Sequence, residues 1–347
     1  MLSKFVLAVT ILTFFSCASI DKTCECRTAR NASSDRIVIY TSIYEDVIKS
    51  LDMALQKHFP NTTIDFVYGG TGQLQSRVAS EIASGRLGAD ILMVAKPSYA
   101  VELMEKGVLH RFKSRYAEDL AFEYDKDGYW YPVRISNMVL AFNPQRNDKN
   151  SIPRSFYDFA HNDSLRDAVS MSNPIISGTS KAAITALRDK YGYEFFQALG
   201  TQNVAIESGA IALSGLESGE RKMVMVLEES VLRKRQQESS TLEVIYPTDG
   251  TIIIPSPIMI VANRWSANNN TSTAELIADW FLSPDGQGAI VNGWMHSVRR
   301  DFNRTPYDSI PLANIQTNRM PFSWENSLRD GNEILITFEE HVINNRR

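Results

Sequence analysis

Apolar runs of strand type alternate with segments of helical periodicity from residue 36 to residue 106. The runs are rich in Val, Ile and Leu and have the length of buried strands; they cover residues 36–42, 63–68 and 89–94. The segments between and after them carry apolar side chains at near-helical spacing, as amphipathic helices do; they cover residues 45–58, 73–84 and 98–106. This alternation predicts a parallel, doubly wound α/β sheet.

A second α/β block lies between two long extended runs, residues 133–143 and 251–262. Its pattern predicts short strands at 169–174, 223–227 and 243–247, and helices at 153–161, 180–191, 193–199 and 210–219, with a further helix at 272–283. The chain leaves the first block near residue 136 and returns near residue 255. We therefore expect a two-lobed α/β fold in which each lobe is a doubly wound sheet and crossing strands join the lobes. Such lobes are suited to hinge closure around a ligand.

The predicted domain organisation follows from these crossings. Residues 36–135 and 255–300 form lobe 1. Residues 136–254 form lobe 2, together with residues 301–347, which are polar and helical in pattern and are expected to cap the body.

Glycine-rich, hydroxyl-bearing turns stand at predicted helix starts in both blocks. They are Gly70-Thr71-Gly72 and Ser177-Gly178-Thr179-Ser180, and Ser42 ends the first strand. In doubly wound sheets ligands bind beyond the carboxyl ends of the strands, and helix N-termini attract anions through free NH groups and the helix dipole. Ordinary N-capping also explains Ser and Thr at these positions. Two such turns at a common cleft favour an anion site, where Ser42, Thr71, Gly72, Ser177 and Thr179 contribute amides and hydroxyls.

Charged and aromatic candidates accompany these turns. Lys96 follows the third strand and Arg134 lies where the chain crosses between the lobes, so each is a candidate to supply positive charge to an anion. The alternative for each is a surface charge or an intramolecular ion pair. Tyr44 and Trp130 either stack on a ring of the ligand or pack within the protein.

Composition narrows the class of function. The chain has 347 residues, 44% of them hydrophobic, and a formal net charge of −4 without a basic run, which argues against a nucleic-acid partner. It contains no P-loop, nucleophile elbow, dinucleotide fingerprint or zinc-protease motif, and its five histidines show no metal spacing. We therefore expect a binding protein, not an enzyme, without cofactor or structural metal.

The N-terminus carries an export signal. Lys4 precedes an apolar run at residues 5–15, which is too short to span a bilayer and has the length of a signal-peptide core. Ser16 directly precedes Cys17, and this junction resembles the relaxed lipoprotein signal of spirochaetes. We expect a signal peptide at residues 1–16, a lipidated Cys17 and a tether at residues 17–35 that anchors the protein to a membrane in the periplasm or cell envelope. An ordinary cleaved signal that happens to contain a cysteine is the alternative.

The cysteines are confined to the N-terminal segment. Cys17, Cys24 and Cys26 are the only ones, and a body without cysteine suits an oxidising compartment. Cys24 and Cys26 are either a metal pair or incidental residues of the tether.

Several segments in order resemble the type II periplasmic binding fold, in the ferric-ion and organophosphorus branch of extracellular solute-binding proteins. They are residues 37–42, 70–72, 89–91, 138–143, 177–179, 208–210 and 278–287. The resemblance implies a monomeric substrate-binding component of an ABC importer that delivers a small solute to its permease.

Within that branch, the stretch from Ser177 to Trp294 is most similar to the hexose-phosphate-binding members. The matching pieces are residues 206–212, 224–230, 246–251 and 293–297. The resemblance implies a sugar phosphate as ligand, with Glu229 accepting hydrogen bonds from the sugar and Glu207 as a second candidate. Ile206 is apolar where those members have a polar sugar contact, which leaves the sugar open.

Ferric iron is the alternative ligand, because related proteins bind it. Fe³⁺ prefers anionic oxygen ligands, commonly paired tyrosinates with a carboxylate. This chain has no two adjacent tyrosines, and Lys96 occupies the segment where iron-binding relatives offer a carboxylate. A lysine there repels a trivalent cation.

Overall fold

The computed structural model describes residues 35–321 and 323–345. Residues 1–34 lie outside the described residues, and with them the predicted signal peptide, Cys17, Cys24, Cys26 and almost all of the tether. No helix within the described part of the chain is long and apolar enough to cross a membrane.

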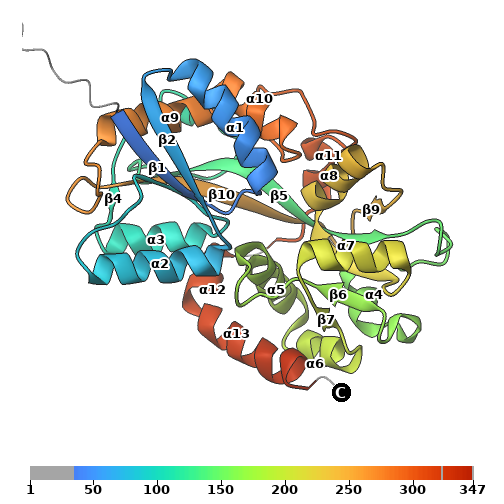
Figure 1. Ribbon diagram of the computed structural model, residues 1–347. Coiled ribbons are helices and arrows are strands. Elements are labelled where there is room, and N and C mark those ends of the chain that lie inside the picture. Colours follow the sequence, from blue (N-terminus) through green and yellow to red (C-terminus); the bar gives the residue numbers. More distant parts are fainter. Residues whose placement is uncertain (1–34, 322, 346–347) are drawn as a thin grey trace, which may run out of the picture. The chain divides into compact units, whose positions relative to one another are not determined.

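The first block folds as its pattern predicts (Figure 1). Its elements are β1 (Asp35–Thr41), α1 (Glu45–His58), β2 (Thr62–Tyr68), α2 (Thr71–Ala83), β3 (Ile91–Met93) and α3 (Pro97–Glu105). β1 is parallel to β2 on one side and to β3 on the other. The buried residues of α1 are Val47, Ile48, Leu51 and Leu55, which share one face at helical spacing.

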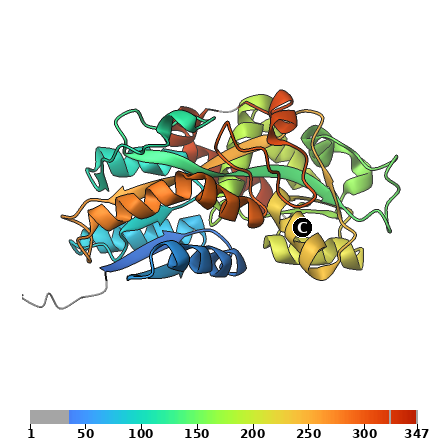
Figure 2. The same ribbon diagram turned by 90° about the horizontal axis from the view of Figure 1, so that it is seen from above.

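Two long antiparallel strands cross from one half of the molecule to the other (Figures 1 and 2). They are β5 (Trp130–Phe142) and β10 (Ile252–Val261), paired from Ile252 opposite Met138 to Met259 opposite Trp130. The short strand β4 (Leu109–His110) also pairs with β10. β5 is buried along almost its whole length, so it reads as one continuous apolar run in which Arg134, Ser136 and Asn137 are buried exceptions.

The second block adds short strands and five helices within the described residues. The strands are β6 (Val169–Met171), β7 (Ala205–Ile206), β8 (Met223–Leu227) and β9 (Glu243–Ile245). The helices are α4 (Phe156–His161), α5 (Gly178–Tyr191), α6 (Glu194–Thr201), α7 (Gly209–Ser218) and α8 (Glu228–Glu238). The sequence pattern did not predict α8, because its second half is nearly all charged or amide side chains and shows no apolar stripe.

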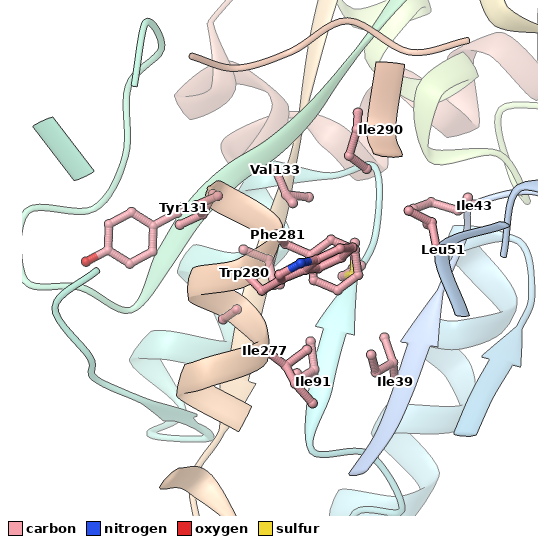
Figure 3. Close-up of a cluster of buried hydrophobic side chains, with 14 of the residues drawn as sticks. Ile39, Ile43, Leu51, Ile91, Tyr131, Val133, Ile277, Trp280, Phe281 and Ile290 are labelled. Carbon is pink, nitrogen blue, oxygen red and sulfur yellow. The ribbon is translucent and has the colours of Figure 1, made fainter. Parts of the chain in front are cut away.

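The sheets of the two halves are continuous through the crossing strands. The described strands run in the order β2-β1-β3-β10-β5-β8-β6-β7. β5 and β10 also supply side chains to two separate cores: Val133 and Ile135 belong to the core of β1, α1 and α9, whereas Leu140 and Phe142 belong to the core of α4, α5 and α6. Figure 3 shows part of the first core, with Ile39, Trp280 and Phe281 in it. We call the part built on the first core lobe 1 and the part built on the second lobe 2.

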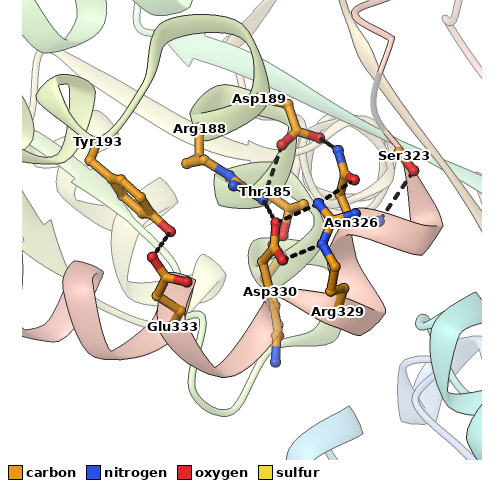
Figure 4. A network of polar contacts seen from close by, with 10 residues as sticks. Thr185, Arg188, Asp189, Tyr193, Ser323, Asn326, Arg329, Asp330 and Glu333 are labelled. Carbon is orange, nitrogen blue, oxygen red and sulfur yellow. Dashed lines mark hydrogen bonds and ion pairs between the residues drawn. The ribbon is translucent and has the colours of Figure 1, made fainter.

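The remaining helices cover both lobes. They are α9 (Thr271–Leu282), α10 (Pro284–Asn292), α11 (Leu312–Thr317), α12 (Trp324–Arg329), α13 (Gly331–Phe338) and a π-helical turn at Glu339–Ile343. α9 and α10 belong to lobe 1, while α13 and the π turn pack on α5 and α6 of lobe 2. α12 contacts α3 as well as α5. Figure 4 shows the polar network that holds this segment, in which Arg188 of α5 pairs with Asp330 at 3.0 Å.

Candidate functional site

A cleft of about 700 Å³ lies between the two lobes and is lined by residues of both. This volume is typical of small-molecule sites. Seven of the nine predicted ligand-binding residues line it: Ser42, Thr71, Arg134, Ser177, Thr179, Glu207 and Glu229. The structure thus brings together residues that lie up to 187 positions apart in the chain.

Five helices direct their N-termini at this cleft. Their N-cap residues all line it: Tyr44 for α1, Gly70 for α2, Ser177 for α5, Ser208 for α7 and Leu227 for α8. Each helix N-terminus carries partial positive charge and unpaired backbone NH groups. Five together make the cleft favourable for an anion.

Arg134 adds a full charge that the protein does not neutralise. Its side chain comes from the crossing strand β5 and is only 3% exposed. Its Nη2 donates to Ser42 Oγ at 3.2 Å and its Nη1 lies 3.2 Å from Met295 Sδ, but its Nε is buried without a partner. Among the residues that the structure describes, no carboxylate lies within 4 Å of this guanidinium. Burial lowers the pKa of Arg134 below its ordinary value, and the nearby Glu229 partly opposes this.

Glu229 stands opposite Arg134 at the start of α8. It is 3% exposed, and its Oε1 accepts a hydrogen bond from Ser136 Oγ at 2.7 Å. Burial raises the pKa of Glu229 to about 7, although Arg134 and Ser136 lower it. The raised pKa favours the protonated carboxyl group, which both accepts and donates hydrogen bonds, over the carboxylate, which only accepts them.

Glu207 is held by a cation of its own. Arg221 Nη2 forms an ion pair with Glu207 Oε1, while Glu207 Oε2 is buried without a partner. Because Arg221 already neutralises the charge, Glu207 does not repel an anion strongly and still offers a free acceptor. That combination suits a ligand hydroxyl group.

The two predicted glycine-rich turns face each other across the lobes. Gly178 packs directly on Thr71: a Cβ at position 178 would lie 2.8 Å from the Thr71 Cβ. Ser177 is the N-cap of α5, where its hydroxyl accepts from the Ser180 amide at 3.2 Å, and it lies 3.1 Å from the Thr179 hydroxyl. The capping interpretation of Ser177 is therefore confirmed, and its place on the cleft does not depend on it.

Gly72 and Lys96 do not line the cleft. The Gly72 amide donates to the carbonyl of Ile176 at 3.1 Å, so it joins the lobes. Lys96 is the N-cap of α3 and lies over the Tyr99 ring, 5.8 Å from its centroid. Burial lowers the pKa of Lys96. A role for either residue in ligand binding stays a prediction.

Of the two aromatic candidates, one lines the cleft and the other does not. Tyr44 lines the cleft, and its hydroxyl lies 2.8 Å from Ser230 Oγ. Burial raises the pKa of Tyr44 to about 12, so its phenol is neutral. Trp130 is not a lining residue and packs against the core of β1 and α3.

The lining residues that sequence analysis did not propose as ligand contacts include Tyr68, Ser208 and Arg233. Ser208 precedes Gly209 at a helix start, the same pattern that identified Ser177. Arg233 belongs to α8, which the pattern did not predict. Tyr68 ends β2, where a strand-end position was the available signal.

Asp249, within the segment 246–251, has a structural role. The Asp249 carboxylate accepts from the amides of Phe156 and Tyr157, both at 3.0 Å, and from the Tyr191 hydroxyl at 2.7 Å. It therefore ties the start of α4 to α5. Asp249 does not line the cleft.

The described residues offer no ready metal site, since their His, Cys, Asp and Glu side chains do not gather in groups of three suited to a metal ion. Tyr44, Tyr68 and Glu229 do offer oxygen atoms to the same cleft.

The chain matches one known protein family and several solved structures. The family described as bacterial extracellular solute-binding protein matches residues 88–313, more than half of the chain. No curated protein sequence matches. Iron-bound HitA from Pseudomonas aeruginosa aligns with a TM-score of 0.76 at 18% identity, over 88% of this chain and 99% of that one.

Two further solved structures have different ligands in their names. AfuA from Actinobacillus pleuropneumoniae, with fructose-6-phosphate bound, aligns with a TM-score of 0.77 at 18% identity, over 90% of this chain and 99% of that one. A periplasmic thiamin binding protein aligns with a TM-score of 0.74 at 14% identity, over 88% and 96%. At such identities the likeness shows the shared two-lobed α/β fold, which confirms the fold prediction, and it does not determine the ligand.

Proposed function

The chain belongs to the family of bacterial extracellular solute-binding proteins, and from that premise we propose that it captures a sugar phosphate in the interlobe cleft and delivers it to an ABC permease. The family is one of substrate-binding transport proteins, which are not enzymes. Its members present small solutes to a membrane transporter, and the proposal concerns which solute this one takes.

The buried, unneutralised guanidinium of Arg134 carries the proposal of an anionic ligand. A buried charge costs several kcal/mol unless it is paired. Within the described structure Arg134 has no anionic partner in contact, so an anion in the cleft would be that partner. The five helix N-termini also favour a negatively charged ligand, because they add positive potential to the cleft without needing neutralisation.

The sugar half of the ligand rests on the acceptors across the cleft. Glu207 has a free carboxylate oxygen, and Glu229 is able to accept or donate. Thr179 and Ser42 add hydroxyl groups to the same cleft. A phosphate at Arg134 and hydroxyl groups toward Glu207 and Glu229 would use each of these groups. The fructose-6-phosphate bound to AfuA is consistent with this class of ligand.

Mass spectrometry of the solute retained through native purification tests the proposal directly. We expect a sugar phosphate, and calorimetry with fructose-6-phosphate should then show binding, whereas fructose and inorganic phosphate should bind at least about 100-fold more weakly because each lacks half of the contacts. Equal affinity for fructose and for its phosphate would contradict the anionic site.

Ferric iron is the second candidate, favoured by the tyrosine and carboxylate oxygens of Tyr44, Tyr68 and Glu229 in the cleft. Against it stands Arg134 in the same cleft, since a guanidinium group without a counterion in contact repels a trivalent cation. We expect the purified protein to remain colourless after ferric loading. A visible tyrosinate-to-iron charge-transfer band would overturn the sugar-phosphate proposal in favour of iron.

The proposal also covers how the protein is attached to the membrane and which residues move when the lobes close. We propose that Cys17 carries lipid and residues 17–35 form the tether, and that residues 36–135 with 255–300 move against the rest of the body. Intact-mass measurement of membrane-extracted protein should show acyl chains that are absent from Cys17→Ser and kept in Cys24→Ser. A diacyl mass retained in Cys17→Ser would rule out this anchor.

A further inference from the structure

The two lobes touch on both flanks of the cleft. On one flank the Gly72 amide donates to the Ile176 carbonyl at 3.1 Å. On the other flank α1 of lobe 1 meets α8 of lobe 2, where Arg233 Nη1 lies 3.1 Å from both carboxylate oxygens of Asp46. Gln237 Nε2 donates to the same carboxylate at 3.2 Å. The second flank therefore contains an ion pair between lobes, not only a backbone contact.

Further contacts between the lobes surround this pair. Arg233 stacks over the Tyr44 ring, with its guanidinium carbon 4.7 Å from the centroid, and the Tyr44 hydroxyl lies 2.8 Å from Ser230 Oγ. Trp294, which packs against the lobe 1 core, donates from Nε1 to Gln236 Oε1 at 2.7 Å. All of these contacts have to break when the lobes separate.

The pair is only partly hydrated. The Arg233 and Asp46 side chains are 27% and 32% exposed, which leaves their attraction less screened than that of a fully exposed pair. Burial raises the pKa of Asp46, but the hydrogen bonds from Arg233 and Gln237 outweigh this effect and lower it below its ordinary value. Asp46 is therefore ionised throughout the neutral range. Arg233 also lines the cleft, with an Nε that is buried and has no partner.

We infer that Asp46 and Arg233 form a latch between α1 and α8 that holds the lobes together around the solute and slows its release. The inference rests on the proposed function, because it assumes that a solute occupies the cleft. Solute enters before the latch forms and leaves only after it breaks, so the latch acts mainly on the dissociation rate.

Asp46→Asn in the full-length protein is the variant that tests the latch. Asp46 does not line the cleft, so the substitution leaves every residue that lines the cleft unchanged. With fructose-6-phosphate as the probe, stopped-flow fluorescence should show dissociation at least about tenfold faster than in the wild type and association within about twofold. Asp46→Glu keeps the charge and should restore the rate to within about threefold.

Asp65→Asn is the matched control. Asp65 pairs with Arg36 at 2.7 Å between β1 and β2, wholly within lobe 1. Asp65→Asn should leave the dissociation rate of the solute unchanged. Thermal unfolding of all variants reports whether the fold is intact, and equal dissociation rates in a folded Asp46→Asn variant would overturn the latch.

A wild type that does not bind fructose-6-phosphate would count against the proposed function and not against the latch. In that case small-angle scattering of the proteins with the solute that they retain through native purification decides. A larger radius of gyration in Asp46→Asn than in the wild type and Asp65→Asn supports the latch, and equal radii overturn it.

Discussion

Replacing Arg134 by methionine separates a binding charge from a structural one. Methionine keeps an apolar stem but removes a guanidinium that is 3% exposed and lacks an anionic contact among the described residues. The substitution abolishes two weak contacts, with Ser42 Oγ and Met295 Sδ, each of them 3.2 Å long, and the longer-range attraction to Glu229. Without solute, the free energy of unfolding should stay within about 1 kcal/mol of the wild type or rise, because the substitution relieves an unpaired buried charge.

Arg134→Met should weaken solute binding strongly, although it leaves the stability unchanged or raises it. Truncating one partner of a buried charge pair costs about 2–5 kcal/mol, which is a loss of roughly 30-fold to several thousandfold in affinity for the sugar phosphate. Isothermal titration calorimetry measures the affinity, and urea denaturation without solute measures the stability.

Arg299 provides the matched control. It is also buried, at 7% exposure, but it bonds to Asp119, Asp301 and the Leu282 carbonyl at 2.8–3.0 Å. Arg299→Met should lose about 2–4 kcal/mol of stability and keep wild-type affinity for the solute. If Arg134→Met behaves like Arg299→Met, destabilised but fully able to bind, then Arg134 is a structural residue and the anion site is wrong.

The remaining predictions concern the acceptor side of the cleft. Burial raises the pKa of Glu229 to about 7, so the folded protein binds the proton of this carboxyl group more tightly than the unfolded chain does. The stability that this proton contributes is fully present below the pKa of the unfolded chain and is lost as the pH rises through about 7. Glu229→Gln should therefore gain stability over the wild type by on the order of 2–3 kcal/mol at pH 8 and match it near pH 4, as measured by urea denaturation; a constant difference at both pH values would show that the pKa is ordinary. Thr179→Ala and Glu229→Ala should each weaken sugar-phosphate binding by more than about 1 kcal/mol in calorimetry, because each leaves polar ligand atoms unpaired, while Thr201→Ala on α6 should not; wild-type affinity in both cleft variants would refute the site.

Periodicity predicted most of the fold because the strands and helices that build the two cores largely alternate along the chain. α1 was predicted at residues 45–58 and is observed at Glu45–His58, since its four buried side chains recur at helical spacing. β5 and β10 were recognised as crossing strands because both of their faces are covered, which makes them continuously apolar. α8 was missed because few of its residues face a core and the rest face water or the other lobe.

The cleft could be predicted in part, because strand ends and helix starts follow from the same periodicity. Ser42, Thr71 and Thr179 occupy such positions, and topology alone brings them to one edge of the sheet. Gly72 and Lys96 occupy similar positions but contact the other lobe and the Tyr99 ring instead. Side-chain direction at a helix start depends on what the neighbouring lobe presents, and a linear pattern does not contain that information.

Charge pairing is the part of the site that only the folded chain determines. Sequence analysis favoured Arg134 over Lys96 but could not decide the role of either, because each was also explained as a surface charge or as part of an intramolecular ion pair. In the structure, Glu207 is neutralised by Arg221, fourteen positions away, and Asp46 by Arg233, 187 positions away. Within the described part of the chain, Arg134 alone of the cleft's three predicted charged residues keeps a full charge without either a counterion in contact or a pKa near neutrality. The charge of the ligand that the cleft favours therefore depends less on the number of cationic side chains in it than on which of them the protein leaves without a counterion.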